Sequence, residues 1–95
     1  MRKYYVYFMA NKYNTVLYVG VTSNLQQRIL QHKNGVSNFT RRYNVTKIIY
    51  WEEFSDIRIA IEREKQIKSW NRDKKISLII EKNPKWTDLY PQILG

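Results

Sequence analysis

One acidic residue stands in the middle of an apolar helical stripe, where its charge needs a chemical explanation. At 3.6 residues per turn, this stripe contains Ile57, Ile61, Glu64 and Ile67. A carboxylate in such a place costs free energy unless it meets a cation, a hydrogen-bond donor or a metal ion. Glu62 points instead to the solvated side of the same helix. Two explanations for Glu64 are therefore open: a structural salt bridge, for example to Arg28, or a functional carboxylate.

A second group of candidates is the pair formed by Arg28 and His32. These residues are four positions apart, so a helix places both side chains on one face. Leu25 and Ile29 belong to the same stripe and are expected to face the core. The pair then flanks the buried edge of the helix instead of pointing into open water. A single helical histidine is often structural, but the neighbouring arginine keeps a functional role open.

The third candidate feature is an aromatic residue beside a glycine in an apolar segment. Tyr18 and Gly20 have the same strand parity, so both face one side of a sheet. The glycine leaves that side without a side chain, which allows a ligand to approach the backbone next to the ring. The alternative is a packed strand tyrosine with a bulge at the glycine.

Positive charge is concentrated in the first half of the chain. Residues 1–51 contain eight Lys and Arg and no Asp or Glu, a net charge of +8, whereas residues 52–95 contain nine basic and eight acidic residues, a net charge of +1. This segregation predicts a nucleic-acid-binding face, since a merely solubilising surface usually mixes both signs. Any carboxylate serving a site on the first half must therefore come from residue 52 onward, and Glu64 is the best placed.

Composition excludes several classes of protein. The chain has 95 residues, 43% of them apolar, which suits one domain with a small packed core. It has no cysteine and one histidine, so disulfide frameworks and thiolate or His-rich zinc sites are excluded. Neither a membrane-spanning apolar run nor a signal peptide is recognisable. We therefore expect a cytoplasmic protein.

Hydrophobic patterning predicts six elements in the order β-β-α-β-α-α. Strands are expected at 4–9, 15–21 and 47–54, and helices at 24–34, 57–70 and 72–81. Ser23 with Gln26 resembles a capping box for the first helix, and Gly35 is its left-handed stop. Asp56 and Asn71 are the expected caps of the other two helices.

The predicted elements must bring the candidate residues together. The order favours the α/β class, of the α+β type, with a small three-stranded antiparallel sheet flanked by helices. Residues 36–45 are expected to form a basic loop that contains Arg41 and Arg42. Residues 1–82 are expected to form the domain, and residues 83–95 an irregular tail packed on it or trailing from it.

These residues together resemble the GIY-YIG nuclease domain, and most closely its small, stand-alone bacterial (YhbQ-like) branch. The matching positions are Tyr5-Val6-Tyr7 for the first motif, Tyr18-Val19-Gly20 for the second, and then Arg28, His32 and Glu64 in family order. The similarity extends from about residue 3 to residue 80. It implies metal-dependent hydrolysis of nucleic-acid phosphodiester bonds, with DNA preferred to RNA.

The resemblance also implies roles for individual residues. The implied catalytic set is Tyr7, Tyr18, Arg28, His32 and Glu64, and the implied substrate contacts are Gly20, Lys33, Arg41, Arg42 and Lys68. Glu64 would hold Mg²⁺ or Mn²⁺, and Arg28 would neutralise charge that develops in the transition state. The two tyrosines and His32 would orient water and transfer protons, and which phenol acts as the base is open.

A catalytically weak or inactive nucleic-acid-binding module, or an adaptor, on the same fold is the alternative function. Positive charge and aromatic rings serve that reading equally well, because phosphate contacts and base stacking require no metal. Glu64 distinguishes the two, since binding to a polyanion gains nothing from a carboxylate on a buried helix face.

Overall fold

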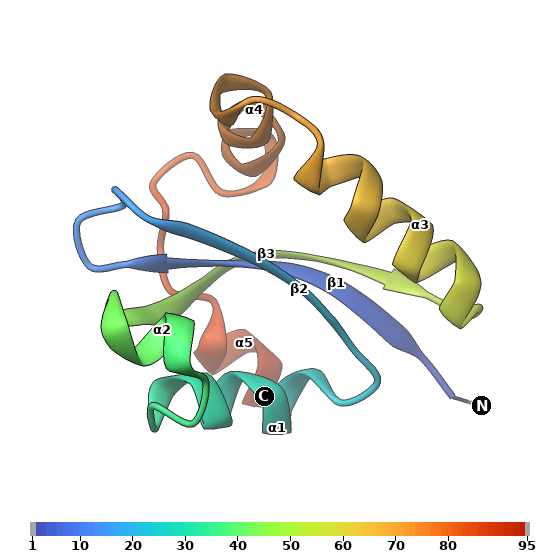
Figure 1. The fold of residues 1–95 in the computed structure, drawn as a ribbon, viewed down its shortest axis with the longest axis horizontal. Coiled ribbons are helices and arrows are strands. Elements are labelled where there is room, and N and C mark those ends of the chain that lie inside the picture. Colours follow the sequence, from blue (N-terminus) through green and yellow to red (C-terminus); the bar gives the residue numbers. More distant parts are fainter. Residues whose placement is uncertain (1, 95) are drawn as a thin grey trace.

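A three-stranded antiparallel sheet, ordered β2-β1-β3, lies at the centre of the computed structural model, which describes residues 2–94 (Figure 1). The central strand β1 (Tyr4–Asn11) pairs with β2 (Leu17–Thr22) and with β3 (Val45–Phe54). Branched and aromatic residues fill these strands, as is typical of buried sheets. The predicted fold class is therefore confirmed.

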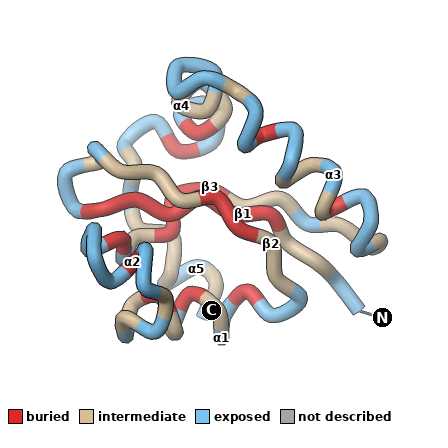
Figure 2. The backbone as a smooth tube through the Cα atoms, viewed as in Figure 1, coloured by how far each residue is buried: buried red, intermediate tan, exposed pale blue. Residues whose placement is uncertain are grey.

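Helices cover both faces of the sheet (Figure 1). On one face lie α1 (Leu25–Lys33), α2 (Asn38–Arg42) and α5 (Tyr90–Leu94), and on the other α3 (Ile57–Lys68) and α4 (Arg72–Lys82). Because side chains alternate along a strand, β1 sends Val6 and Phe8 toward α3 and α4, and Tyr7 and Met9 toward α1 and α5. Figure 2 shows the buried residues concentrated along β1 and the middle of β3. The tyrosine of the first motif thus faces the helix that carries Arg28 and His32.

Three of the four predicted helix boundary residues are confirmed. The side chain of Asp56 accepts a hydrogen bond from the backbone at the start of α3, and that of Asn71 does so for α4. Gly35 follows α1 with φ at +73°, and its N–H donates to the His32 carbonyl at 3.1 Å.

The predicted cap of α1 is wrong by one residue. Asn24, and not Ser23, accepts from the backbone N–H of Gln27 at 3.1 Å and donates to the Gln27 side chain at 3.2 Å. The Thr22 hydroxyl accepts from the Asn24 N–H at 3.1 Å and holds the cap in place. The arrangement differs from the predicted capping box, because Gln27 accepts from the Asn24 side chain and not from its backbone N–H, which Thr22 binds.

Two segments expected to be irregular contain helices. The basic loop holds α2, whose buried residue is Thr40, and the tail ends in α5. Pro91 lies in the first turn of α5, where the missing N–H costs no helical hydrogen bond. Within residues 2–94, no helix is both long and apolar enough to cross a bilayer.

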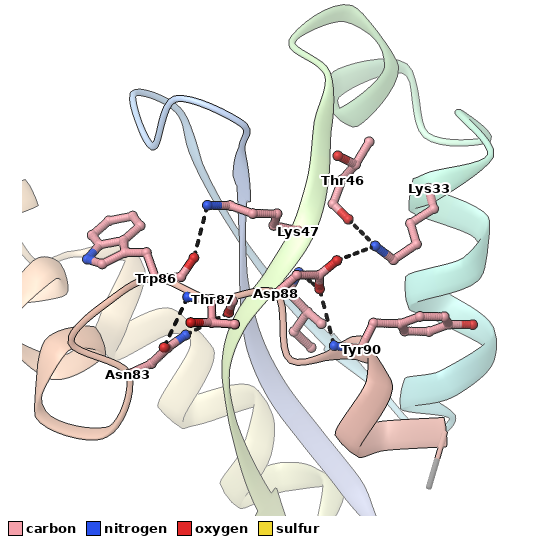
Figure 3. Close-up of polar contacts among 9 residues, drawn as sticks. Lys33, Thr46, Lys47, Asn83, Trp86, Thr87, Asp88 and Tyr90 are labelled. Atoms are coloured by element: carbon pink, nitrogen blue, oxygen red, sulfur yellow. Dashed lines mark hydrogen bonds and ion pairs between the residues drawn. The ribbon is translucent and has the colours of Figure 1, made fainter.

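The chain after α4 packs against β3, as Figure 3 shows. Thr46 and Ile49 are extra residues in the register between β3 and β1, so they mark bulges. The carbonyl of Thr46 accepts from Lys33 Nζ at 2.7 Å, and that of Ile49 accepts from Asn83 Nδ2 at 2.9 Å. In addition, the Leu89 N–H donates to the Ile48 carbonyl at 2.8 Å. The tail, together with Lys33 of α1, thereby supplies partners for backbone groups that the sheet leaves unpaired.

Candidate active site

Three of the predicted site residues form a cluster between the sheet and α1. Tyr7 from β1 lies opposite Tyr18 from β2 and His32 from α1, with ring centroids 6.2 and 5.8 Å away, and the Tyr18 and His32 rings are 5.1 Å apart. The Tyr7 hydroxyl is 2.8 Å from His32 Nε2. Tyr7 and His32 are each 1% exposed, whereas Tyr18 is only half-buried.

The hydrogen-bond partners of His32 assign its tautomer. The Thr40 hydroxyl donates to the Ser37 carbonyl at 3.3 Å, so its oxygen is free to accept from His32 Nδ1–H at 3.1 Å. His32 Nε2 then carries no proton and accepts from the Tyr7 hydroxyl. The chain of donors therefore runs in one direction, from Tyr7 through His32 and Thr40 to the carbonyl of Ser37, the N-cap of α2.

Burial keeps His32 neutral. Burial first, and the nearby charge of Arg28 second, lower the pKa of His32 to about 4. Burial also raises the pKa of Tyr7, with the neighbouring Tyr18 adding to the effect, although Arg28 opposes it. Tyr7 is thus a protonated hydrogen-bond donor at neutral pH and is poorly suited to act as a phenolate base.

Stability is expected to fall as the pH drops from about 6.5 to about 4. In this range His32 binds a proton in the unfolded chain but stays neutral in the native protein, where its pKa is about 4. The free energy of unfolding should decrease by up to about 1.4 kcal/mol per pH unit across this window. Urea unfolding at a series of pH values measures the slope. Carboxylates also titrate near the lower end, so His32→Gln is the control. An identical slope in that variant would contradict the burial of a neutral imidazole.

Arg28 lies beside both phenols. Burial works against its charge, but hydrogen bonding with Tyr7 and Tyr18 raises the pKa of Arg28, so the guanidinium is cationic. Its Nη1 also donates to Gln31 Oε1 at 3.1 Å. A half-buried guanidinium beside two aromatic hydroxyls can bind a phosphate through planar donors.

The reason predicted for Gly20 is wrong in its geometry. Gly20 pairs directly with Tyr7 across β1 and β2, and a Cβ on Gly20 would lie 2.5 Å from the Tyr7 hydroxyl oxygen and 2.6 Å from Cζ. The space that the glycine leaves is therefore filled by the Tyr7 phenol and is not open to a phosphate. Gly20 positions Tyr7 by letting its ring cross the backbone of β2.

Glu64 comes from the other layer of the molecule. It lies on α3, which contacts both β1 and β2, and its charge adds to the rise in the pKa of Tyr7. Its side chain is 16% exposed and forms an ion pair with Lys68, Nζ to Oε2, at 3.2 Å. The salt bridge suggested with Arg28 is thus replaced by an i, i+4 pair. The predicted stripe is also less buried than expected, because Ile57 is 39% exposed.

The donors around Glu64 fit a cation that keeps much of its water. No group of three or more His, Cys, Asp or Glu side chains lies together in the described part of the chain. A single, largely enclosed carboxylate suits Mg²⁺ or Mn²⁺, because Mg²⁺ is commonly bound by one or two carboxylates together with waters and substrate phosphates. Such a cation would have to compete with Lys68 for Oε2.

The four basic residues predicted to contact substrate differ in whether a carboxylate already pairs with them. Lys33 forms an ion pair with the Asp88 carboxylate at 2.7 Å and donates to the Thr46 carbonyl, so a residue of the tail already neutralises its charge (Figure 3). Lys68 is paired with Glu64. Arg41 and Arg42 are exposed on α2. Of these four, the two arginines are the cations best placed for a polyanion.

Three residues of α2 and its C-cap belong to the site but were not predicted from the sequence. Thr40 holds His32, Phe39 packs against Tyr18 with centroids 5.6 Å apart, and Tyr43 packs against Phe39 at 4.9 Å. The available signal was the four-residue spacing of Phe39 and Tyr43, which is typical of a helix. The excess of charge and polar residues in this segment favoured a loop instead.

Comparison with known proteins gives consistent results. Residues 3–77 match the GIY-YIG catalytic domain family. A UPF0213 protein of Clostridium perfringens is 40% identical over 82 residues, covering 85% of this chain and 87% of that protein. One of Staphylococcus haemolyticus is 36% identical over 83 residues, covering 86% and 100%. The solution NMR structure of a UPF0213 protein from Bacillus halodurans superposes with a TM-score of 0.59 at 25% identity, covering 90% and 92% of the two chains.

Proposed function

The chain belongs to the GIY-YIG catalytic domain family, and from this membership we propose that it is an endonuclease that hydrolyses nucleic-acid phosphodiester bonds with a divalent metal ion. GIY-YIG nucleases generally use divalent metals and act on nucleic acids. We expect Mg²⁺ or Mn²⁺ here, and DNA in preference to RNA. The observation that carries the proposal is the buried chain from Tyr7 through His32 to Thr40, next to Arg28.

Each residue of the cluster has a proposed task. Arg28 binds a non-bridging phosphate oxygen and stabilises the charge that develops on it. The Tyr7 hydroxyl donates to His32 Nε2, which fixes the phenol and directs its remaining lone pair away from the imidazole. Tyr18 is half-buried beside Arg28 and is therefore the phenol placed to orient the attacking water. Glu64 would hold the cation, which supplies Lewis-acid stabilisation of the phosphoryl oxygens.

A cleavage panel tests the proposal. Supercoiled plasmid, single-stranded DNA, a branched duplex and RNA are incubated with the full chain and Mg²⁺ or Mn²⁺, with EDTA as the control. We expect metal-dependent cleavage of at least one DNA substrate. Binding without cleavage in every arm would instead favour the non-catalytic binding module.

Nucleic-acid binding is expected to be strongly salt-dependent, because residues 1–51 carry eight cations and no carboxylate. Replacing Arg41 and Arg42 with glutamine should weaken binding to all sequences and reduce the log-affinity against log-salt slope by about 1–2. Fluorescence anisotropy in EDTA at several salt concentrations measures the slope.

The matched control for this slope replaces Lys74 and Lys75 with glutamine. They lie on α4, on the opposite face of the sheet, so the slope should change much less. An equal change in the two double variants would show that α2 is not the nucleic-acid face.

A further inference from the structure

A row of three aromatic rings leads from the candidate active site onto the surface of α2. The Tyr18 ring is 5.6 Å from Phe39, and Phe39 is 4.9 Å from Tyr43, with interplanar angles of 39° and 49°. Tyr18 also contacts His32, so the row begins at the buried cluster. The rings therefore form a continuous path from the chemistry to solvent.

The outer two rings are exposed. Phe39 and Tyr43 are each 41% exposed, so their rings do not turn into the core. The residue that α2 buries is instead Thr40, which is held by His32. Exposed large aromatic residues grouped beside a functional site mark a binding surface more often than a scattered exposed residue does.

Cations flank the exposed rings. The Arg42 guanidinium carbon lies 5.5 Å from the Tyr43 ring centroid, and Arg41 is exposed on the same short helix. No Asp or Glu occurs before residue 52. Aromatic faces between arginines are the arrangement that binds unpaired nucleotides, because bases stack on the rings while the cations meet the phosphates.

We infer that Phe39 and Tyr43 form a subsite that stacks an unpaired nucleobase adjoining the phosphate at Tyr18 and Arg28. This inference rests on the proposed nuclease function and names the class of its substrate, a nucleic acid with at least one unpaired base next to the cut. A base inside an intact duplex is already stacked on both faces, so it cannot occupy the subsite. A second copy of the chain is a poorer occupant, since two α2 surfaces would bring their arginines together.

Binding of two DNA probes in EDTA tests the inference without cleavage. One probe is a single-stranded oligonucleotide that carries 2-aminopurine, and the other is the same strand in a duplex. Phe39→Leu and Tyr43→Leu should each weaken single-strand binding about 5- to 100-fold, the range that loss of base–aromatic stacking gives. They should also remove the quenching of 2-aminopurine, with much smaller effects on the duplex.

Two further variants control for keeping a ring at position 39 and for losing an exposed ring elsewhere on the surface. Phe39→Tyr keeps a ring and should retain near-wild-type affinity. Tyr13→Leu removes another exposed tyrosine, 75% exposed with Lys12 Nζ 5.7 Å from its ring, from the turn between β1 and β2. It should leave single-strand binding unchanged, because that ring is outside the row.

Three outcomes would overturn the inference: unchanged affinity in both leucine variants, equal losses on single strand and duplex, or equal losses in Tyr13→Leu. A dimeric wild-type chain with a monomeric Phe39→Leu variant, measured by light scattering, would also overturn the inference and assign the patch to self-association. If ring-dependent single-strand binding is found but no metal supports cleavage, the subsite stands and the nuclease proposal fails.

Discussion

Glu64→Gln is expected to abolish metal-dependent cleavage, with a loss of about 10³-fold or more, and to leave the fold intact. The substitution keeps the shape of the side chain but removes the charge that would hold a divalent cation, whose stabilisation of transition-state charge is worth several kcal/mol. Stability should change by less than about 1 kcal/mol, because the lost contact is one i, i+4 ion pair with Lys68, which is itself 53% exposed.

Glu62→Gln is the matched control for Glu64→Gln. It lies two residues earlier on α3 and is exposed, so the same chemical change should leave cleavage and melting temperature near those of the wild type. Single-turnover rates over a range of Mg²⁺ and Mn²⁺ concentrations compare the two. If both variants lose activity alike, or neither does, the metal-binding role proposed for Glu64 is wrong.

Tyr18→Phe removes the phenol proposed to orient the attacking water, and Tyr7→Phe removes the hydroxyl that joins His32 Nε2 to Arg28. Each should lower the single-turnover rate by about 10²–10⁴-fold with little change in nucleic-acid affinity. The two variants should differ in stability. Tyr7→Phe leaves buried His32 Nε2 without its donor, which costs about 1–3 kcal/mol in the free energy of unfolding. Tyr18 is half-buried, so its hydroxyl can meet water and its loss should hardly affect unfolding.

Tyr50→Phe controls for the general effect of removing a strand hydroxyl. Tyr50 lies on β3 on the opposite face of the sheet, where its hydroxyl donates to Glu52. Its loss should affect stability but not the rate of cleavage. Near-wild-type rates in both Tyr7→Phe and Tyr18→Phe would return these tyrosines to a packing role and leave Arg28, His32 and Glu64 as the catalytic set.

The features that could be predicted from the sequence are local ones. The strands follow from short runs of branched and aromatic residues, and the caps at Asp56 and Asn71 are read directly from residue type and position. The common face of Arg28 and His32 follows from helical periodicity alone. The ion pair between Glu64 and Lys68 is also a local, four-residue relation. Arg28 was expected as the partner because the apolar stripe predicted a buried Glu64, whereas Ile57 at the start of that stripe is 39% exposed.

The features that could not be predicted depend on register and on distant segments. The contact of Tyr7 with Gly20 requires the exact pairing of β1 with β2, which a one-residue slip would remove. The pairing of Lys33 with Asp88 joins residues 55 positions apart. Thr40 orients His32 from a five-residue helix whose charged and polar composition favoured a loop, so its role appears only in three dimensions.

The tail that packs against β3 also has a consequence for association between molecules. β3 is an edge strand, and an edge strand with free N–H and carbonyl groups can pair with another chain and seed aggregation. Here the Ile48 N–H is taken by Asp88 at 3.2 Å, and the Ile48 and Ile49 carbonyls by Leu89 and Asn83. These three partners lie beyond residue 77, where the match to the catalytic family ends. A fragment that ends at residue 77 would therefore expose unpaired backbone groups of β3. Residues 83–89 protect this strand edge from pairing with another chain.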